Sequence, residues 1–193
     1  MTDNANPAAP TAPPDPDKLK MFSFGVFTQL SGAVTAGMIH LGDKLGLFEA
    51  MAGFDEPVTT EQIADAAGLD ERWVREWAYN QAAAKLISVD AGSSPERFWL
   101  SPEARAVLAS PDHAAYGMGM FHRFPQTMAA LEEMPESFRT GLGHDYDSHG
   151  CEGAIGIERS FEPWNRHHLL PTVLPAVGMV DRLRSGAHVI DIG

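Results

Sequence analysis

The sequence predicts a mainly α-helical fold with a small β-hairpin wing, that is, a winged helix-turn-helix followed by further helices. Three observations lead to this prediction: an apolar stripe at helical spacing near the N-terminus, an ordered series of helix caps and strand signals between Thr59 and Ser101, and more helix-start signals after it. An apolar strand that begins at His188 predicts, in addition, the start of an α/β domain.

Charge and cysteine content limit the classes of partner. The 193 residues carry 26 acidic and 14 basic side chains, for a net charge of −12. Nucleic acids and anionic membrane surfaces bind clusters of Lys and Arg. Because this chain is acidic, we expect neither as the main partner. Cys151 is the one cysteine and cannot form an internal disulfide. This fits the reducing cytoplasm, where we expect the protein.

Residues 1–18 are predicted to be a disordered tail. They hold five prolines and no Val, Ile, Leu, Phe, Trp or Tyr, so little apolar burial can offset the entropy of ordering them. The segment also lacks an apolar stretch behind a basic start, so it is not predicted to be a secretory signal.

The segment from Met21 to Gly42 has 22 residues without a formal charge. It is long enough to cross a bilayer, but its apolar period continues through Asp43, Lys44 and Glu49, so we do not expect a membrane span. Small residues would let a second helix approach, and the helix belongs either to the core of one monomer or to a contact between subunits. The apolar stripe, at spacings of three and four, consists of Leu30, Val34, Met38, Leu41, Leu45 and Phe48.

The helix-turn-helix is marked by its caps. Thr59 and Gln62 form a capping box, and Gly68 ends the first helix. Asp70 then caps a second helix. Four residues follow on that helix at helical spacing, namely Val74, Trp77, Ala78 and Gln81.

A hairpin follows the second helix. Strand signals at Leu86 to Val89 and at Arg97 to Leu100 flank the turn sequence AGSSPE. Ser101 with Pro102 predicts the cap and first residue of the next helix. Helix, turn, helix and hairpin in this order predict a winged helix.

The charges of this winged helix oppose DNA binding. Between Thr60 and Asp90 there are six acidic and three basic residues, where phosphate neutralisation needs the opposite sign. Trp73 and Trp77 lie on the second helix, where short polar side chains would reach base edges. We therefore expect a scaffold or a subunit contact.

Ser110 and Pro111 predict another helix start, and the region 111–184 is predicted to be helical. Its Met and Phe residues suit either an irregular core or an adaptable apolar pocket. In residues 140–153 possible metal ligands alternate with glycines at no spacing typical of a metal site. We expect no metal there and interpret the segment as a polar loop or a substrate-side lid.

Near the C-terminus, Ser185 and Gly186 end a helix, and HVIDIG then begins an apolar strand that reaches Gly193. A strand that leads to Asp-x-Gly is typical of the start of a nucleotide-binding βα turn. The glycine would permit close approach of the backbone to a ligand.

Four segments together carry a resemblance to a known family: GDKLGLFEAM, TTEQIADAAGLDERWVREWAYNQAAAKLISVD, FWLSPEARAVL and LRSGAHVIDIG. Over residues 20–193 the chain resembles class I S-adenosylmethionine-dependent methyltransferases that have an N-terminal winged-helix dimerisation domain. The resemblance implies a winged-helix dimerisation domain at 19–110, a helical substrate-side region at 111–184 and the first strand of a Rossmann-like methyltransferase domain at 185–193.

The resemblance also implies the function, which is methyl transfer from S-adenosylmethionine to a small-molecule acceptor by a homodimer. Of the family's D-x-G-x-G-x-G pattern only Asp191, Ile192 and Gly193 are in the sequence, so these are the expected cofactor residues and the chain is expected to be an N-terminal portion. No catalytic base is identified. The alternative is a winged-helix regulator that binds DNA or senses a ligand. The expected substrate residues are Met118, Phe121, Phe124, Met128 and Tyr146.

Overall fold

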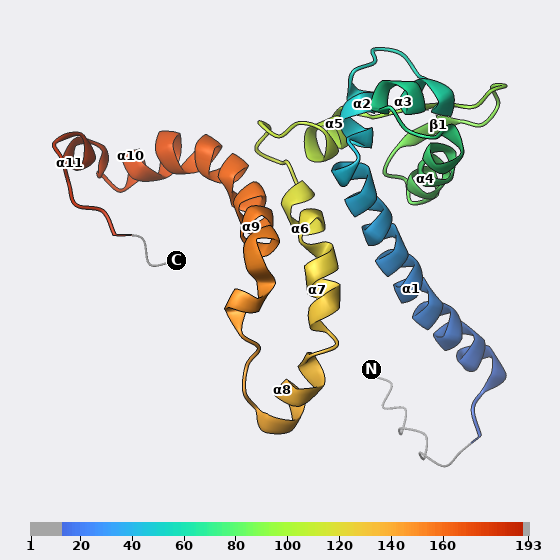
Figure 1. Ribbon diagram of the computed structural model, residues 1–193, viewed down its shortest axis with the longest axis horizontal. Coiled ribbons are helices and arrows are strands. Elements are labelled where there is room, and N and C mark those ends of the chain that lie inside the picture. The colour runs from blue at the N-terminus through green and yellow to red at the C-terminus, as the bar shows by residue number, and fades with distance from the viewer. Residues whose placement is uncertain (1–12, 191–193) are drawn as a thin grey trace, which may run out of the picture. The chain divides into compact units, whose positions relative to one another are not determined.

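The computed structural model describes residues 13–190, and the chain divides into two compact units, Met1–Val34 and Thr35–Gly193. In the first unit, the described residues from Pro16 onward form the N-terminal part of helix α1 (Pro16–Lys44), as Figure 1 shows.

Helix α1 starts inside the predicted tail. The side chain of Asp15 accepts hydrogen bonds from the backbone N–H groups of Asp17 (2.9 Å) and Lys18 (3.2 Å), which caps the helix. Residues 16–18 are therefore helical, contrary to the predicted tail of residues 1–18, while residues 1–12 lie outside the described residues. The prediction missed this cap because composition averaged over 18 residues hides one capping aspartate.

The first unit presents large apolar side chains to the surface. Helix α1 is long and apolar enough to cross a membrane by length and composition alone, and 6% of its most apolar 18-residue window is buried. Soluble monomers rarely expose a contiguous apolar surface of this kind. The exposed large apolar residues of this unit include Leu19, Met21, Phe22, Phe24, Val26, Phe27, Leu30 and Val34.

The second unit begins with the last part of α1 and continues into a winged helix. Its two short strands pair antiparallel, with Ser88 opposite Trp99, and an isolated bridge joins Val58 to Phe98. The unit buries one apolar core among these elements. The elements in order are α2 (Leu47–Ala52), α3 (Thr60–Ala67), α4 (Glu71–Ala83), β1 (Ser88–Asp90), β2 (Arg97–Trp99) and α5 (Pro102–Leu108).

The predicted caps of the winged helix are confirmed. Thr59 and Gln62 form both hydrogen bonds of the capping box, and Gly68 ends α3 with a left-handed φ of 67°. Asp70 accepts from the backbone N–H of Arg72 at the start of α4. Ser101 caps α5 in the same way. The four residues at helical spacing on α4 are all buried, namely Val74, Trp77, Ala78 and Gln81.

Trp77 connects the end of α1 with the winged helix by packing and by a hydrogen bond. Its ring lies edge-on to Phe48, with 5.1 Å between centroids, and its Nε1 donates to the Met38 carbonyl at 3.0 Å. A Cβ on Gly42 would lie 2.7 Å from the Phe48 ring and 2.8 Å from the Trp77 ring, so glycine is required there. The prediction that Trp77 lies where base edges would be read is wrong, because its side chain is 2% exposed in the core.

The predicted apolar stripe is interrupted. Helix α1 ends at Lys44 and Gly46 takes a left-handed φ of 69°, so Phe48 lies on α2 and not on the same helix as Leu30. Leu41 and Leu45 are exposed, whereas Phe48 is fully buried. The periodicity continued across the break because both helices contribute apolar residues at similar spacing.

The helix predicted at Ser110 and Pro111 does not form. The Ser110 hydroxyl donates back to the Arg105 carbonyl at 2.9 Å, so it satisfies the end of α5 and caps no new helix. Successive turns follow instead, and the next helix starts at Met118.

The rest of the second unit is helical (Figure 1). Gly150 begins α9, so the last four residues of the predicted loop 140–153 are helical. The described elements are α6 (Met118–His122), α7 (Phe124–Ala130), α8 (Met134–Thr140), the 3₁₀ turn η1 (Tyr146–His149), α9 (Gly150–Trp164), the π-helix η2 (Asn165–Val173), α10 (Leu174–Ala176) and α11 (Val180–Arg184).

Helices α6 and α9 pack through glycines. A Cβ on Gly119 would lie 2.3 Å from the Ser160 backbone N and 2.5 Å from the Gly156 carbonyl O. A Cβ on Gly156 would lie 2.9 Å from both the Gly119 carbonyl O and the Cβ of Arg123. Only residues without a Cβ allow the two backbones to approach this closely.

The described part of the predicted C-terminal strand has no partner. Residues 187–190 form neither helix nor strand, and the side chains of Val189 and Ile190 are 73% and 84% exposed. A strand is stabilised by its neighbours, and the sheet among the described residues contains β1 and β2 alone. Asp191, Ile192 and Gly193, the expected cofactor residues, lie outside the described residues.

Candidate functional site

A cavity of about 390 Å³ lies among α7, η1 and α9 in the second unit. Arg123, Gln126 and Thr127 line it from one side, at the i, i+3, i+4 spacing that places residues on one face of a helix. Small residues of α9 leave the space open opposite them. The remaining lining residues are Tyr146, Asp147, His149, Gly150, Cys151, Gly153, Ala154 and Ile157.

The cavity lining offers several kinds of chemistry. Arg123 has no carboxylate within 4 Å among the described residues, although Asp147 also lines the cavity. The Oε1 atom of Gln126 is buried and has no hydrogen-bond partner there. The rings of Tyr146 and His149 meet edge to face, with 5.7 Å between centroids. A cation, an unsatisfied acceptor and two rings thus share one cavity.

The structure places one of the five predicted substrate residues, Tyr146, in the lining of this cavity. Phe124 and Met128 lie on α7, which borders the cavity, but they are not among its lining residues. Met118 is fully buried in the core of the winged helix, and Phe121 packs against that core. The core alternative therefore describes Met118 and Phe121, and the substrate role of all five stays a prediction.

Sequence reasoning missed Arg123 and Gln126. The two residues are three apart in the sequence, but the pocket was predicted from the Met and Phe residues of this region, so polar residues were not considered. The glycines of α9 were visible too, and they were interpreted as a loop. Small residues at positions 150, 153 and 154 of one helix face could have indicated a cavity wall.

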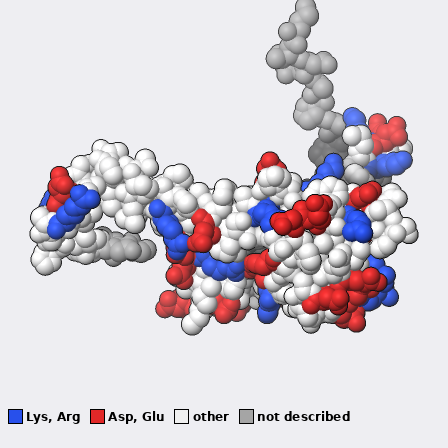
Figure 2. Space-filling view, turned by 90° about the horizontal axis from the view of Figure 1, so that it is seen from above, with Lys and Arg blue, Asp and Glu red and all other residues white. Residues whose placement is uncertain are grey.

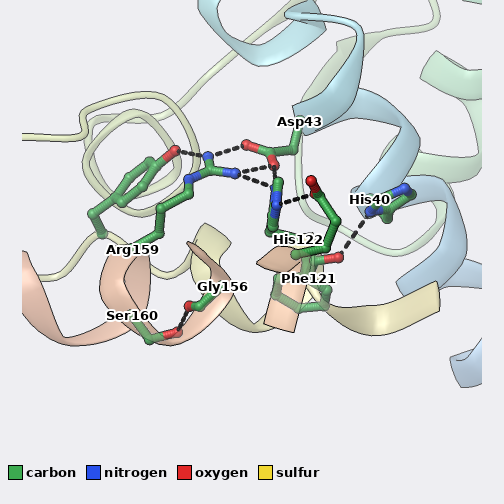
Figure 3. Close-up of polar contacts among 9 residues, drawn as sticks. His40, Asp43, Phe121, His122, Gly156, Arg159 and Ser160 are labelled. Carbon is green, nitrogen blue, oxygen red and sulfur yellow. Dashed lines mark hydrogen bonds and ion pairs between the residues drawn. The ribbon is translucent and has the colours of Figure 1, made fainter. Parts of the chain in front are cut away.

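A polar cluster anchors α9 beside the cavity (Figure 3). Arg159 on α9 donates to both carboxylate oxygens of Asp43, at 2.6 and 2.7 Å, and to the Tyr116 hydroxyl at 2.7 Å. It also contacts Nδ1 of His122 at 2.9 Å. His122 Nε2 lies 2.9 Å from Glu152 Oε2. A guanidinium can only donate, so His122 Nδ1 accepts and Nε2 carries the proton.

Hydrogen bonds and burial both determine the electrostatics around the cluster. The Asp43 side chain is 3% exposed, and its hydrogen bonds raise the pKa of Arg159 above its ordinary value. Burial raises the pKa of the Tyr116 hydroxyl and, on α2, that of the Glu49 carboxyl. Arg159 therefore stays charged and links the end of α1 with the segments that carry Tyr116 and His122 (Figure 3).

No group of three or more His, Cys, Asp or Glu side chains among residues 13–190 is arranged to hold a metal ion. The candidate ligands of the segment 140–153 contact one another instead. The ring centroids of His144 and His149 lie 5.7 Å apart, and Ser148 Oγ lies 2.6 Å from His144 Nε2.

The arginines of α4 are already paired. Arg72 lies 3.0 Å from Glu76, and Arg75 lies 3.7 Å from Glu71. On the face in view in Figure 2, Lys and Arg side chains are interspersed with Asp and Glu. The charges available to a phosphate backbone are therefore partly neutralised within the protein.

Comparison with protein families identifies the winged helix. Residues 33–110 match the family model of the Rv2258c-like winged HTH domain. This part of the chain is similar to Rv2258c-like winged HTH domains. Its match begins within α1 and ends after α5, which agrees with the winged helix described above and includes the segment that Trp77 fastens. Comparison with curated protein sequences finds no match.

Solved structures share the fold beyond the winged HTH domain. Mitomycin 7-O-methyltransferase is 20% identical, with a TM-score of 0.60, and the match covers 77% of this chain and 46% of that one. Human N-acetylserotonin methyltransferase in complex with SAM is 14% identical, with a TM-score of 0.53 and coverages of 79% and 44%. A riboflavin-derivative dimethyltransferase from Streptomyces davawensis is 20% identical, with a TM-score of 0.51 and coverages of 78% and 45%.

These similarities confirm the predicted resemblance at the level of the fold. The chain spans less than half the length of the solved structures that it matches. The match covers more of the chain than the winged HTH domain alone, so it also includes part of the helical region that carries the cavity.

Proposed function

We propose that the chain is the N-terminal part of an S-adenosylmethionine-dependent methyltransferase that acts on a small-molecule acceptor. The observation that carries this proposal is the shared fold, which joins a winged HTH domain to the helices after it over 77–79% of the chain. The three proteins named above are methyltransferases by name. In this proposal the chain supplies a subunit contact and one wall of the acceptor pocket.

The proposed chemistry is an in-line displacement at the methyl group of a sulfonium donor, which is the chemistry that the cofactor supplies when bound. The protein then needs mainly to align the acceptor and exclude water. The cavity among α7, η1 and α9 is the proposed acceptor wall, with Tyr146 as its predicted member. We assign no residue as catalytic base.

The residues proposed to hold S-adenosylmethionine are Asp191, Ile192 and Gly193. Their chemistry fits that cofactor, because a carboxylate suits a ligand with two positive centres and glycine permits close approach of the backbone. They end the segment 185–193, the proposed first strand of a Rossmann-like domain, and ligands of such domains bind at the carboxyl ends of the strands.

We also propose that the protein is a cytoplasmic homodimer. The exposed apolar residues of α1, which include Phe22, Phe24 and Phe27 at 69–75% exposure, support a contact with a second copy. The single cysteine supports the reducing compartment.

Calorimetry with S-adenosylmethionine tests the proposal. It compares the 193-residue chain with a chain extended through a complete cofactor sheet, and labelled methyl transfer is assayed in parallel. We expect binding in the micromolar range and transfer with the extended chain alone, because a strand without neighbours offers no preorganised site. Micromolar binding by the 193 residues would place the site in the helical region and refute the assignment of Asp191 and Gly193. An extended chain that neither binds the cofactor nor transfers methyl would refute the methyltransferase proposal.

A further inference from the structure

The cavity holds an arginine that makes no ion pair within 4 Å among the described residues, although Asp147 also lines the cavity. In the same helical region Arg139, Arg159 and Arg166 each lie within 4 Å of a carboxylate, whereas Arg123 has no such partner among the described residues. Arg123 is partly buried, and its Cβ and Cγ pack against Gly156 on α9. Removing a cation from water is favourable only where an anion or strong acceptor meets it, so the cavity suits an anionic group.

The second feature of the cavity is an unpaired acceptor on Gln126. Gln126 follows Arg123 by three residues and lines the same cavity, and its Oε1 is buried without a hydrogen-bond partner. A buried acceptor left unpaired destabilises the protein, and a donor on a bound molecule would relieve that cost. The cavity therefore suits a molecule that brings an N–H or O–H group close to its anionic group.

The third feature is the shape of the lining. Tyr146 and His149 present aromatic rings, while Gly150, Gly153 and Ala154 add little or no side chain. The two rings stand at 75° to each other, and a planar aromatic ring can meet the face of one and the edge of the other. A volume of about 390 Å³ lies at the small end of ligand pockets, which suits a molecule of one or two rings.

We propose that this cavity selects a planar aromatic acid with an amino or hydroxyl group next to its carboxylate. Arg123 would bind the carboxylate, Gln126 would accept from the neighbouring donor, and the rings of Tyr146 and His149 would lie against the aromatic ring. This inference rests on the proposed function, since it names the acceptor class of the same cavity.

The test is equilibrium binding of 2-aminobenzoate, a fluorescent probe with both groups, to the 193-residue chain. Benzoate lacks the donor and aniline lacks the carboxylate, so both should bind about tenfold more weakly or worse, the expected effect of losing one good polar contact. Equal binding of all three compounds, or no saturation by 2-aminobenzoate at millimolar concentration, would overturn the proposal.

Two variants assign the contacts. Arg123→Met keeps the stem that packs on Gly156 and should weaken 2-aminobenzoate about tenfold or more without affecting aniline. Gln126→Leu should weaken 2-aminobenzoate without affecting benzoate. Arg139→Met, at an exposed pair on α8, is the matched control and should change neither. If both cavity variants bind like the parent, the assigned contacts are wrong.

The comparison of compounds on the parent chain does not depend on how well the variants fold. It also separates the two proposals, because binding requires no methyl transfer. Selective binding together with an inactive extended chain would refute the methyltransferase proposal alone. Methyl transfer together with unselective binding would refute the acceptor class alone.

Discussion

The ion pair of Asp43 and Arg159 shows how a single residue can join distant segments. The carboxylate is 3% exposed, and both of its oxygens accept from the guanidinium. Removing one partner of a buried pair leaves the other charge uncompensated. Arg159→Met should therefore lower the free energy of unfolding by about 3 kcal/mol, as measured by urea denaturation.

The matched control for this prediction is Arg72→Met, which removes an exposed pair with Glu76 on α4. Exposed pairs contribute little, so stability should stay close to that of the parent. If the two variants lose equal stability, the pair of Asp43 and Arg159 contributes no more than a surface contact.

Glu49 gives a pH-dependent prediction. Burial raises the pKa of its carboxyl, and nearby Asp43 raises it further, while its own backbone hydrogen bond and Arg159 oppose them. The folded state thus holds this proton more tightly than the unfolded state, so the ionised group destabilises the fold as pH rises above about 4.5. Glu49→Gln should match the parent at pH 4 and exceed its stability at pH 7. Denaturant midpoints across this range measure the difference, and a constant offset would contradict it.

Which residues could be predicted depended on sequence distance. The partners of Thr59, Asp70 and Ser101 lie within three residues, so their caps were readable from the sequence. Arg159 and Asp43 are 116 residues apart, and neither occurs in a periodic pattern that indicates the other. Long-range pairs of this kind depend on how the helices pack, which local sequence does not determine.

At the scale of the elements, the contact between α6 and α9 requires glycine. Gly119→Ala would place a Cβ within 2.5 Å of backbone atoms of Gly156 and Ser160, which cannot move aside as a flexible side chain would. We expect a loss of about 1–3 kcal/mol, measured by thermal or urea unfolding. Gly143→Ala, with no atom within 4 Å of the added Cβ, is the control and should leave stability nearly unchanged.

The winged helix should not bind DNA appreciably. The arginines of α4 are paired with Glu71 and Glu76, and the buried Trp77 cannot reach a groove. Binding to random-sequence duplex at low salt should not exceed that of a globular protein without a basic patch. Submicromolar affinity with a steep salt dependence would contradict the scaffold interpretation and favour a regulator.

Elements whose ends are marked by local caps were predicted well. Elements whose ends depend on competing hydrogen bonds or on tertiary packing were not. Ser110 has the sequence of a helix cap, but its hydroxyl satisfies the end of α5 instead. Gly46 ends a helix whose apolar period continues beyond it. The start of α9 was missed because Gly150 and Gly153 are poor helix formers, and tertiary packing overrides that propensity here.

For the molecule as a whole, we expect the exposed apolar residues of α1 to form the dimer contact. Ala33→Arg would place a charge among exposed apolar residues of α1 and should shift sedimentation from dimer to monomer. Ala66→Arg, on the exposed side of α3, is the matched control and should leave the profile unchanged. A parent chain that is monomeric at about 50 µM would contradict the dimer, since weak dimers still form there. Flotation with neutral lipid vesicles would show instead that α1 associates with membranes.

Sequence reasoning predicted the general organisation and resemblance better than the site. The winged helix follows from order and caps, which sequence carries directly. The cavity depends on how α7 and α9 face each other, which local sequence does not carry, so Arg123 and Gln126 were not predicted. The substrate role of Tyr146 stays a prediction. The strand expected at 185–193 depends on neighbouring strands that the described residues do not supply.

The buried position of Trp77 has a spectroscopic consequence. It is the buried one of four tryptophans, because Trp73, Trp99 and Trp164 are 36–75% exposed. Its indole lies in an apolar setting and donates to the Met38 carbonyl, so it emits at shorter wavelength than the solvated three. The blue edge of the intrinsic fluorescence therefore reports whether the end of α1 stays docked on α4. The fluorescence of Trp77 can thus be used, without an added label, to follow the contact between α4 and the end of α1.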